Sequence, residues 1–489
     1  MCNCENMKLW KYGNGRVSCP SSRVLLMLSL SLFAYFHNST IAYCAEGASA
    51  PRHLFSETSA QKAERLSWWT HDRFGMFIHF GLYSIPARGE WIKKIETIPE
   101  AKYDEYFKTF NPDLFDAKAW ARAAKDAGMK YAVLTVKHHE GFCLWDSKFT
   151  DYKAPNTPAK RDVLREIVDA FRAEGLRIGF YYSLLDWHHP QFPIDPKHPL
   201  RNRPAAEIAE MNKKRDIRKY AKYMRDQVTE LLTNYGKIDI LWFDFSYAKD
   251  EHNGTRGKGR ADWESEKLVK LVRKLQPDII LDNRLDLPEA ADIVTPEQFQ
   301  PEHPPRRADG SIAPWEGCQT FSGSWGYHRD EATWKSDKQC VEMLIRPVAR
   351  GGNLIMNVGP TARGYFDHRA MARLDAFAKW MDRNARSIYG CTMAPDEFKE
   401  ADGTRYTWNP RTKRLYVHIL DWPFQRLHLP NLAGKVAYAQ FLHDGSELSG
   451  FENGHATWNS EDLPAGTLTL RLPVVQPDVI VPTVELFLK

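Results

Sequence analysis

Acidic, imidazole and indole side chains follow several short apolar runs of this sequence, where they could act on a polyhydroxylated molecule. The clearest case is Asp244, which ends the apolar run of residues 240–243 and precedes Phe245. Burying an unpaired carboxylate is strongly unfavourable, so this position needs a partner, a substrate charge or a catalytic use. A structural use as the cap of a following helix is the simpler alternative.

Nine other side chains lie at the ends of the apolar runs or in the loops that follow them: His79, Glu90, Trp91, His138, His139, Tyr181, Trp242, Arg284 and Glu297. Carboxylates and imidazoles form hydrogen bonds to hydroxyl groups, and aromatic rings cover the apolar faces of a sugar, so the combination favours a neutral polyol. The cluster has neither a glycine loop for phosphate nor a serine nucleophile elbow.

Three histidines, His79, His138 and His139, could instead bind a metal. No H-x-H or H-E-x-x-H pair places two of them as neighbouring ligands, so we expect no metal and no cofactor. Successive side chains of a regular strand point to opposite faces. His138 and His139 can therefore both reach one pocket only if a bulge interrupts the strand.

A parallel α/β fold would bring these residues together. Apolar strands are expected at residues 74–80, 131–137, 177–183, 238–244, 278–283, 291–297 and 353–359, and amphipathic helices at 116–128, 162–175, 263–276 and 368–390. Buried strands that alternate with helices favour a (β/α)8-like barrel over residues 55–390, in which the strands' C-terminal ends meet at one rim. No G-x-G-x-x-G motif follows the first strand, which disfavours a dinucleotide-binding sheet.

The pattern changes after Cys391. Residues 395–489 contain short alternating runs separated by Gly, Pro, Asn and Asp, which predicts a small C-terminal antiparallel β-sandwich. Cys143, Cys318, Cys340 and Cys391 have no metal-binding spacing, and their pairing cannot be derived from the sequence.

Residues 1–45 have the pattern of a signal peptide. Four basic residues precede the apolar run 24–36, which suits a signal-peptide core and is short for a bilayer span; an uncleaved anchor is the alternative. We expect cleavage near Ala45 and export to an extracellular, periplasmic or lysosome-like compartment. Removing residues 1–45 takes away four basic residues and one acidic residue, so the formal charge falls from +5 to +2. This balance gives no reason to expect nucleic acid or a membrane surface as partner.

Several motifs, in order along the chain, resemble the α-L-fucosidases of glycoside hydrolase family 29. They are RFGMFIHFGLYSIPARGEW (73–91), YAVLTVKHHEGFCLWDSKFTDY (131–152), WFD (242–244), WEGCQTFSGSWGY (315–327) and GGNLIMNVGP (351–360). The β-rich tail is also similar to that family's C-terminal domain. The resemblance implies a retaining, metal-independent hydrolase that releases terminal L-fucose from oligosaccharides or glycoconjugates through a fucosyl-enzyme intermediate.

The resemblance also implies roles for the candidate residues. Asp244 would be the nucleophile and Glu297 the acid/base, with Glu316 as the rival because the acid/base position varies within the family. The other eight side chains named above would contact the sugar, and Trp325 would wall the pocket near its methyl group. Two departures suggest an altered preference for the leaving group: Phe245 stands where the family commonly has glycine, and the polar loop 247–261, expected to be mobile, lies beside the site.

Two other activities fit the same residues. A secreted protein that binds fucose without cleaving it would not need both Asp244 and a candidate proton donor. A glycosidase of the same mechanism could act on L-galactose, because an apolar methyl pocket cannot strongly reject one added hydroxyl group. The sequence leaves the linkage, the natural glycan and the oligomeric state open.

Overall fold

The computed structural model describes residues 57–452 and 463–489. The predicted signal peptide lies outside these residues. Within the described part of the chain, no helix is both long enough and apolar enough to cross a bilayer.

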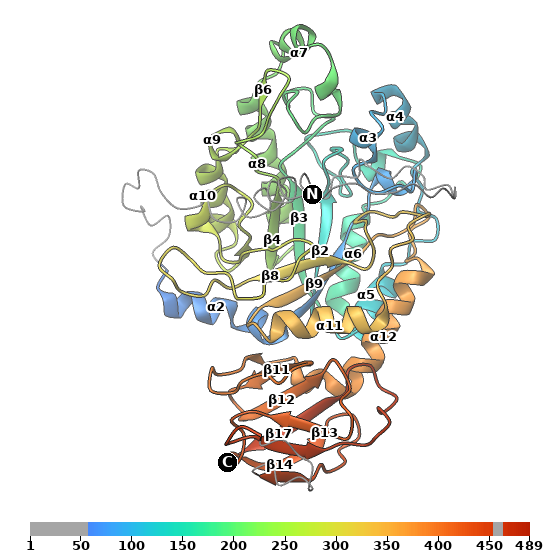
Figure 1. Ribbon diagram of the computed structural model, residues 1–489. Coiled ribbons are helices and arrows are strands. Elements are labelled where there is room, and N and C mark those ends of the chain that lie inside the picture. The colour runs from blue at the N-terminus through green and yellow to red at the C-terminus, as the bar shows by residue number, and fades with distance from the viewer. Residues whose placement is uncertain (1–56, 453–462) are drawn as a thin grey trace, which may run out of the picture. The chain divides into compact units, whose positions relative to one another are not determined.

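A parallel sheet of seven strands lies at the centre of the larger region (Figure 1). Its order is β7 (Ile280–Leu281), β4 (Ile240–Asp244), β3 (Arg177–Ser183), β2 (Tyr131–Lys137), β1 (Phe74–Ile78), β9 (Asn353–Val358) and β8 (Glu316–Thr320). The two edge strands are joined through the segment 292–298. Asp292 N donates to Leu281 O at 2.8 Å, and Glu316 N donates to Val294 O at 2.9 Å. The sheet therefore curls into a barrel whose eighth position is this irregular segment.

The predicted strand at 291–297 is thus present only as isolated bridges, Val294 to Trp315 and Glu297 to Cys318. Pro296 has no N–H group to donate, which limits regular pairing there. Strand β8 was not predicted, because its residues combine a charged start with polar positions and lack a continuous apolar run.

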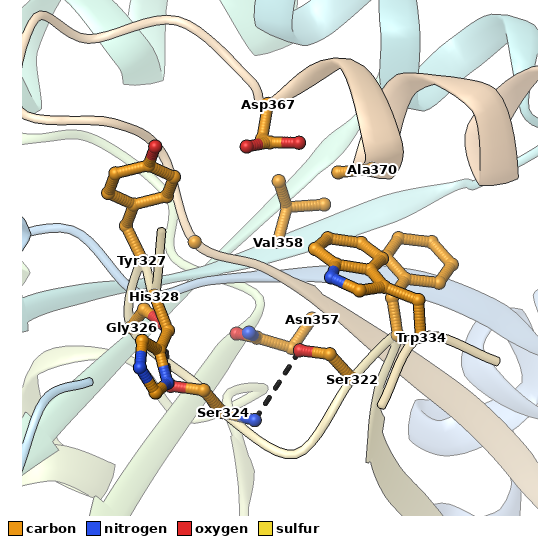
Figure 2. Close-up of a pocket in the computed structure, with 12 residues that line it drawn as sticks. Ser322, Ser324, Gly326, Tyr327, His328, Trp334, Asn357, Val358, Asp367 and Ala370 are labelled. Carbon is orange, nitrogen blue, oxygen red and sulfur yellow. Dashed lines mark hydrogen bonds between the residues drawn. The ribbon is translucent and has the colours of Figure 1, made fainter. Parts of the chain in front are cut away.

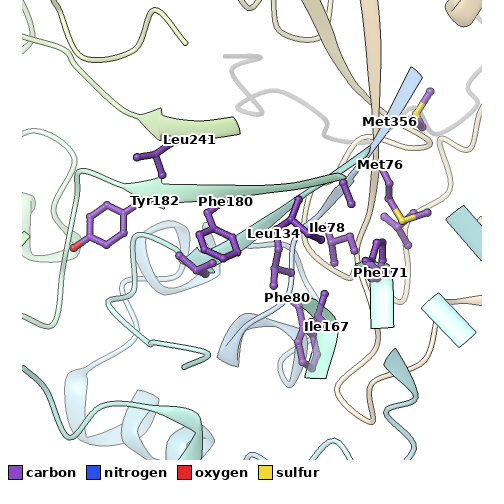
Figure 3. Packing of buried hydrophobic residues seen from close by; sticks show 14 of the residues in the cluster. Met76, Ile78, Phe80, Leu134, Ile167, Phe171, Phe180, Tyr182, Leu241 and Met356 are labelled. Atoms are coloured by element: carbon purple, nitrogen blue, oxygen red, sulfur yellow. The ribbon is translucent and has the colours of Figure 1, made fainter. Parts of the chain in front are cut away.

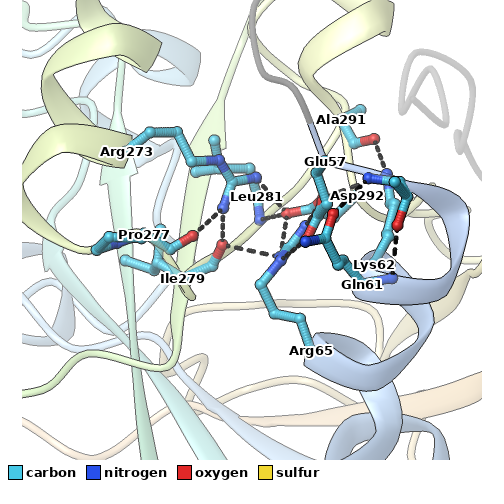
Figure 4. A network of polar contacts seen from close by, with 11 residues as sticks. Glu57, Gln61, Lys62, Arg65, Arg273, Pro277, Ile279, Leu281, Ala291 and Asp292 are labelled. Atoms are coloured by element: carbon cyan, nitrogen blue, oxygen red, sulfur yellow. Dashed lines mark hydrogen bonds and ion pairs between the residues drawn. The ribbon is translucent and has the colours of Figure 1, made fainter.

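Four ionic and hydrogen-bonding partners hold the irregular segment in place (Figure 4). The buried Asp292 carboxylate pairs with Arg65 at 2.7 Å and with Arg273 at 2.5 Å, and it accepts from Leu281 N at 2.9 Å. Lys62 lies 3.2 Å from the same carboxylate. Burial acts to raise the pKa of Asp292, but the three cations together lower it well below its usual range. The segment that leads to Glu297 is therefore anchored at its start.

Helices surround the sheet: α2 (Ser59–Asp72), α5 (Ala117–Asp126), α6 (Val163–Ala173), α8 (Ile217–Asn234), α10 (Ser265–Leu275), α11 (Asp337–Val348) and α12 (His368–Asn384). The four predicted helices correspond to α5, α6, α10 and α12; α2, α8 and α11 were not predicted. Asp116 and Asp162 cap α5 and α6 by accepting from backbone N–H groups in the first turn. Shorter helices, α3 (Ile92–Ile95), α4 (Glu100–Thr109), α7 (Ala205–Asn212) and α9 (Arg260–Trp263), belong to the connections that follow strands.

Alternation along each strand separates two apolar layers. Side chains such as Ile78, Leu134 and Phe180 face outward and pack with Ile167 and Phe171 of α6 (Figure 3). The residues between them face the barrel interior, where the buried set includes Phe77, Val133, Tyr181, Ile240, Trp242 and Ile355. Because side chains alternate along a strand, the same period of two determines which polar side chains at the strand ends face the barrel interior.

The C-terminal region contains two antiparallel sheets. One has the order β10 (Thr392–Met393), β11 (Thr404–Asn409), β12 (Arg414–Ile419), β17 (Thr483–Leu488) and β14 (Val436–Phe441); the other has β13 (Arg426–Leu429), β16 (Leu468–Arg471) and β15 (Gly450–Glu452). Apolar residues from both sheets, including Tyr406, Val417, Leu427 and Leu470, form one core. The predicted α/β barrel with a C-terminal antiparallel β-sandwich is confirmed.

Candidate functional site

Asp244 lies at the C-terminal end of β4 and is almost completely buried, with 8% of the residue exposed. Its Oδ1 accepts from Arg284 Nη1 at 3.0 Å, and its Oδ2 accepts from the Tyr181 hydroxyl at 2.7 Å. Burial raises the pKa of Asp244 to about 6; Arg284 opposes this shift, and the nearby Glu297 adds to it. The carboxylate is paired rather than capping a helix.

Arg284 joins Asp244 to Glu297. Its Nη2 donates to Glu297 Oε2 at 2.8 Å, and its Nε donates to Thr295 Oγ1 at 3.1 Å. The guanidinium carbon lies 5.0 Å from the centre of the Trp242 ring. One planar cation thus fixes two carboxylates, of which Glu297 is the accessible one, with 41% of its side chain exposed.

Glu316 lies elsewhere. It is the first residue of β8, so it sits at the N-terminal end of the barrel, whereas Asp244 is the last residue of β4. It has no exposed surface, and its Oε1 accepts from Trp69 Nε1 at 3.2 Å and from the Tyr131 hydroxyl. Burial raises the pKa of Glu316 to about 7. Of the two rival carboxyl groups, only Glu297 reaches the rim that carries Asp244.

Replacing Glu316 by Gln is expected to remove a pH-dependent loss of stability. The pKa of Glu316 is higher in the folded protein than in the unfolded chain. The protonated carboxyl therefore contributes fully to the free energy of unfolding below about pH 4.3, and this contribution is lost as the pH rises through 7. A glutamine carbonyl oxygen in the place of Oε1 can keep the hydrogen bonds from Trp69 and Tyr131, and the amide does not titrate. Between pH 4.5 and 8, wild type should lose about 3 kcal/mol relative to the Glu316→Gln variant.

Urea unfolding at several pH values measures this difference. Glu64→Gln, at an exposed position on α2, is the matched control and should follow wild type at every pH. Parallel stability curves for wild type and Glu316→Gln would contradict the buried, protonated state of Glu316.

Both adjacent histidines reach the interior side of the rim, as the bulge hypothesis requires. The register of β2 against β3 shifts between Thr135 and Lys137, and β2 ends before His138. The His138 and His139 ring centres lie 3.9 Å apart, and His138 stacks on Tyr181 at 5.6 Å. Burial lowers the pKa of each ring well below its usual range, so both imidazoles are neutral.

Hydrogen bonds select the tautomers of two histidines. Asn357 Nδ2 donates to Trp325 O at 2.7 Å, so Asn357 Oδ1 accepts from His79 Nδ1 at 2.6 Å. Ser183 donates its hydroxyl to Leu185 O, so its oxygen accepts from His139 Nδ1 at 2.6 Å. Nε2 of both rings is left as an acceptor for a donor such as a sugar hydroxyl. Burial lowers the pKa of His79 to about 3.

Glu90 and Trp325 form another part of the wall. Glu90 is buried, which raises the pKa of its carboxyl, and its Oε2 accepts from Gly326 N at 2.8 Å. The Trp325 ring lies 5.2 Å from His79. A cleft is lined by Ser322, Ser324, His328 and Trp334 of the same segment and by Asn357 of β9 (Figure 2). Asp244 is not among its lining residues, so this cleft is distinct from the carboxylate pair.

Two aromatic residues in contact with Trp91 were not among the candidate site residues. Trp187 is buried against His139 and Trp91, at ring distances of 5.4 and 5.3 Å, and donates its backbone N–H to His139 O. Phe245 lies 5.1 Å from Trp91 and has φ 82°, in the left-handed region that favours glycine. Such a conformation costs a bulky residue about 1–2 kcal/mol. Phe245 therefore keeps the left-handed backbone conformation that suits glycine, and its side chain adds an aromatic ring next to Trp91.

The polar loop 247–261 forms a short hairpin of β5 (Glu251–His252) and β6 (Thr255–Arg256). Tyr247 donates its hydroxyl to Asp195 at 2.5 Å, and His252 contacts Asn202 at 2.9 Å. These bonds connect the loop to the segment that follows β3.

Comparisons with known proteins identify the family to which this chain is similar. The family model described as Alpha-L-fucosidase matches residues 41–386. Plasma alpha-L-fucosidase of Homo sapiens is 30% identical over 393 residues, which cover 73% of this chain and 76% of the relative.

Two solved structures show the same fold. Alpha-L-fucosidase isoenzyme 1 from Paenibacillus thiaminolyticus is 45% identical, with a TM-score of 0.80 over 88% of this chain and 99% of that chain. A GH29 alpha-L-fucosidase from Bacteroides thetaiotaomicron, described as a covalent intermediate trapped with 2-fluoro-fucosyl fluoride in a mutant enzyme, is 26% identical, with a TM-score of 0.71 over 91% and 98%. The family match, the relative and the shared fold together lead to one conclusion: this chain belongs to the α-L-fucosidase family.

Proposed function

We propose that the protein is a retaining exo-α-L-fucosidase in which Asp244 is the nucleophile and Glu297 the acid/base. The observation that carries this proposal is the Arg284 guanidinium, which holds both carboxylates at the C-terminal rim of the barrel. This bridge is compatible with the separation of about 5–5.5 Å between the carboxyl groups of retaining enzymes.

The two displacements follow from these positions. An Asp244 carboxylate oxygen bonds to C1 of the fucosyl group while the bond from C1 to the leaving oxygen breaks, and protonated Glu297 gives that oxygen its proton. Glu297, now ionised, then takes a proton from water as the water oxygen bonds to C1 and the bond to Asp244 breaks. Asp244 is poorly hydrated, so the positive charge that develops on the sugar replaces solvent as its partner.

The surrounding side chains suit recognition of the sugar. His79 and His139 offer Nε2 acceptors, and Glu90, His138 and Tyr181 add polar contacts to fucose hydroxyls. Trp91, Trp242 and Trp325 supply ring faces for its apolar parts. The trapped covalent intermediate described for the Bacteroides thetaiotaomicron relative supports a retaining mechanism for this chain as well.

Turnover of 4-nitrophenyl α-L-fucoside, followed by proton NMR of the first sugar released, tests the proposal. The initial product should be α-L-fucose, because two displacements restore the configuration at C1. Release of β-L-fucose would contradict the retaining mechanism, and binding without turnover would favour the silent fucose-binding protein. Comparison of kcat/KM with the α-L-galactoside decides between the two substrates, with L-fucose expected to be preferred.

Export and two functional regions complete the proposal. Residues 1–45 would act as the signal peptide, residues 55–390 as the catalytic region and residues 395–489 as the accessory β-sandwich. The human relative is named a plasma enzyme, which supports an exported protein. N-terminal sequencing of the exported chain would identify the cleavage position.

Prolonged EDTA treatment is expected to leave kcat and the thermal midpoint unchanged. Two carboxyl groups suffice for the retaining reaction. Within residues 57–452 and 463–489, one group of three possible metal ligands converges, namely Glu100, Asp104 and His188, and the three histidines of the site do not belong to it. There, the Lys93 ammonium already lies 2.9 Å from Glu100. Enzyme dialysed without EDTA is the control, and loss of activity that zinc restores would overturn the metal-free mechanism.

A further inference from the structure

Basic side chains border the wall that carries Trp91 and Phe245, and the proposed reaction does not use them. Lys94 lies on α3 (Figure 1), with its Nζ 4.7 Å from the centre of the Trp91 ring. Arg201, in the turn Pro199–Asn202, donates from Nη1 to the Lys94 carbonyl at 3.4 Å. Lys197 Nζ lies 6.0 Å from the Phe245 ring. The connections after β1 and β3 thus bring three cations to the same side of the rim.

Carboxylates of the described residues pair with only one of these three cations. Lys197 pairs with Asp250 at 2.5 Å. Throughout the described part of the chain, no carboxylate lies within ion-pair distance of Lys94 or Arg201. Lys94, over the Trp91 ring, and Arg201, bonded to the Lys94 carbonyl, are therefore two neighbouring cations that no carboxylate pairs within the described residues.

The surroundings of Lys94 disfavour its charge. Burial and the neighbouring charges of Arg201 and Lys197 lower the pKa of Lys94 to about 8, although Asp195 and Asp250 act in the opposite direction. Burial also lowers the pKa of Arg201. Cations that are partly dehydrated and repel one another are stabilised when an anion binds between them.

Lys94 lies next to Trp91 and near His139, which are proposed to contact fucose, and Arg201 contacts Lys94. Lys94 is near enough to His139 to lower the pKa of that imidazole, after the larger effects of burial, His79 and Lys137. The Trp91 ring, over which Lys94 lies, is 4.7 Å from His139 and 5.1 Å from Phe245. A sugar linked to fucose would meet these rings on leaving the pocket.

We propose that Lys94 and Arg201, with the ring faces of Trp91 and Phe245, form a subsite for an anionic sugar to which the fucose is linked. The rings would stack on the sugar, while the ammonium and guanidinium groups would bind its anionic group, either a sulfate ester or a carboxylate. This inference rests on the proposed α-L-fucosidase activity and names a class of substrate for it.

The test compares fucosyl disaccharides that share one linkage and differ in the second sugar: galactose, galactose 6-sulfate and galacturonic acid. For wild type, we expect kcat/KM to be about tenfold higher for an anionic disaccharide than for the neutral one, as a charge-assisted hydrogen bond allows. This ratio should fall towards one in Lys94→Gln and in Arg201→Gln, and it should shrink as salt is added. Comparison of kcat/KM for the galactose 6-sulfate and galacturonic acid disaccharides identifies which anion is preferred.

Lys102→Gln is the matched control, because Lys102 is an exposed lysine on the nearby α4 and its replacement removes the same charge. Its ratio should equal that of wild type. Equal kcat/KM for neutral and anionic disaccharides in wild type would overturn the subsite while leaving the proposed function intact. Failure to cleave any fucoside, including the 4-nitrophenyl compound, would instead overturn the proposed function.

Discussion

Replacing Asp244 by Gly should lower kcat on 4-nitrophenyl α-L-fucoside by at least about 10³-fold, because no other group can form the bond to C1. The fold should persist: Arg284 Nη1 and the Tyr181 hydroxyl lose their acceptor, but Arg284 keeps Glu297 and Thr295 as partners. Steady-state kinetics and thermal unfolding measure the two effects separately.

Azide distinguishes a lost nucleophile from a damaged pocket. In Asp244→Gly it can enter the vacated space, attack C1 and give β-L-fucosyl azide with partial recovery of turnover. Asp244→Asn is the matched control, because its side chain keeps the size of Asp244 and should be inactive without rescue. Activity close to wild type in either variant would remove Asp244 from the mechanism.

Replacing Glu297 by Ala should reduce kcat/KM by about 10²- to 10⁴-fold on substrates with poor leaving groups, which require protonation of the departing oxygen. A 4-nitrophenyl leaving group departs without that proton, so formation of the fucosyl enzyme should be much less affected. Its hydrolysis should then be slow, because no base activates water. Pre-steady-state measurements should therefore show a burst of 4-nitrophenol followed by slow turnover.

Glu316→Gln is the informative comparison for this variant. Glu316 is buried at the N-terminal end of the barrel and has no route to the leaving oxygen, so its replacement should leave the dependence on the leaving group as in wild type. If Glu316→Gln shows the strong dependence and Glu297→Ala does not, the acid/base assignment is reversed.

Local patterns were sufficient to predict much of the fold. The apolar run before Asp244 predicts a buried strand that ends in a carboxylate, and the observed strand is Ile240–Asp244. The helices α5 and α6 begin next to their predicted starts, because Asp116 and Asp162 supply N-caps that are visible in the sequence. Signals of this kind act over a few residues and need no knowledge of the rest of the chain.

Local patterns could not predict which of Glu297 and Glu316 lies at the same end of the barrel as Asp244. Both are carboxylates beside short β-prone segments, but pairing of β8 with β9 makes Glu316 the first residue of its strand, at the end of the barrel away from Asp244. Glu297 instead follows a segment anchored through Asp292, and Arg284 links it to Asp244. The register of parallel strands depends on partners that are distant in the chain, which no local pattern encodes.

The sequence by itself thus determined which residue types end the strands, and with them the class of chemistry. Only the tertiary structure decided which of these side chains face one another: the irregular end of β2 that brings His138 and His139 together, and the connections that place Lys94 beside Arg201. The physical reason is that hydrophobic alternation and capping are local free energies, whereas strand register, bulges and loop contacts are settled by packing between segments that are far apart in the chain.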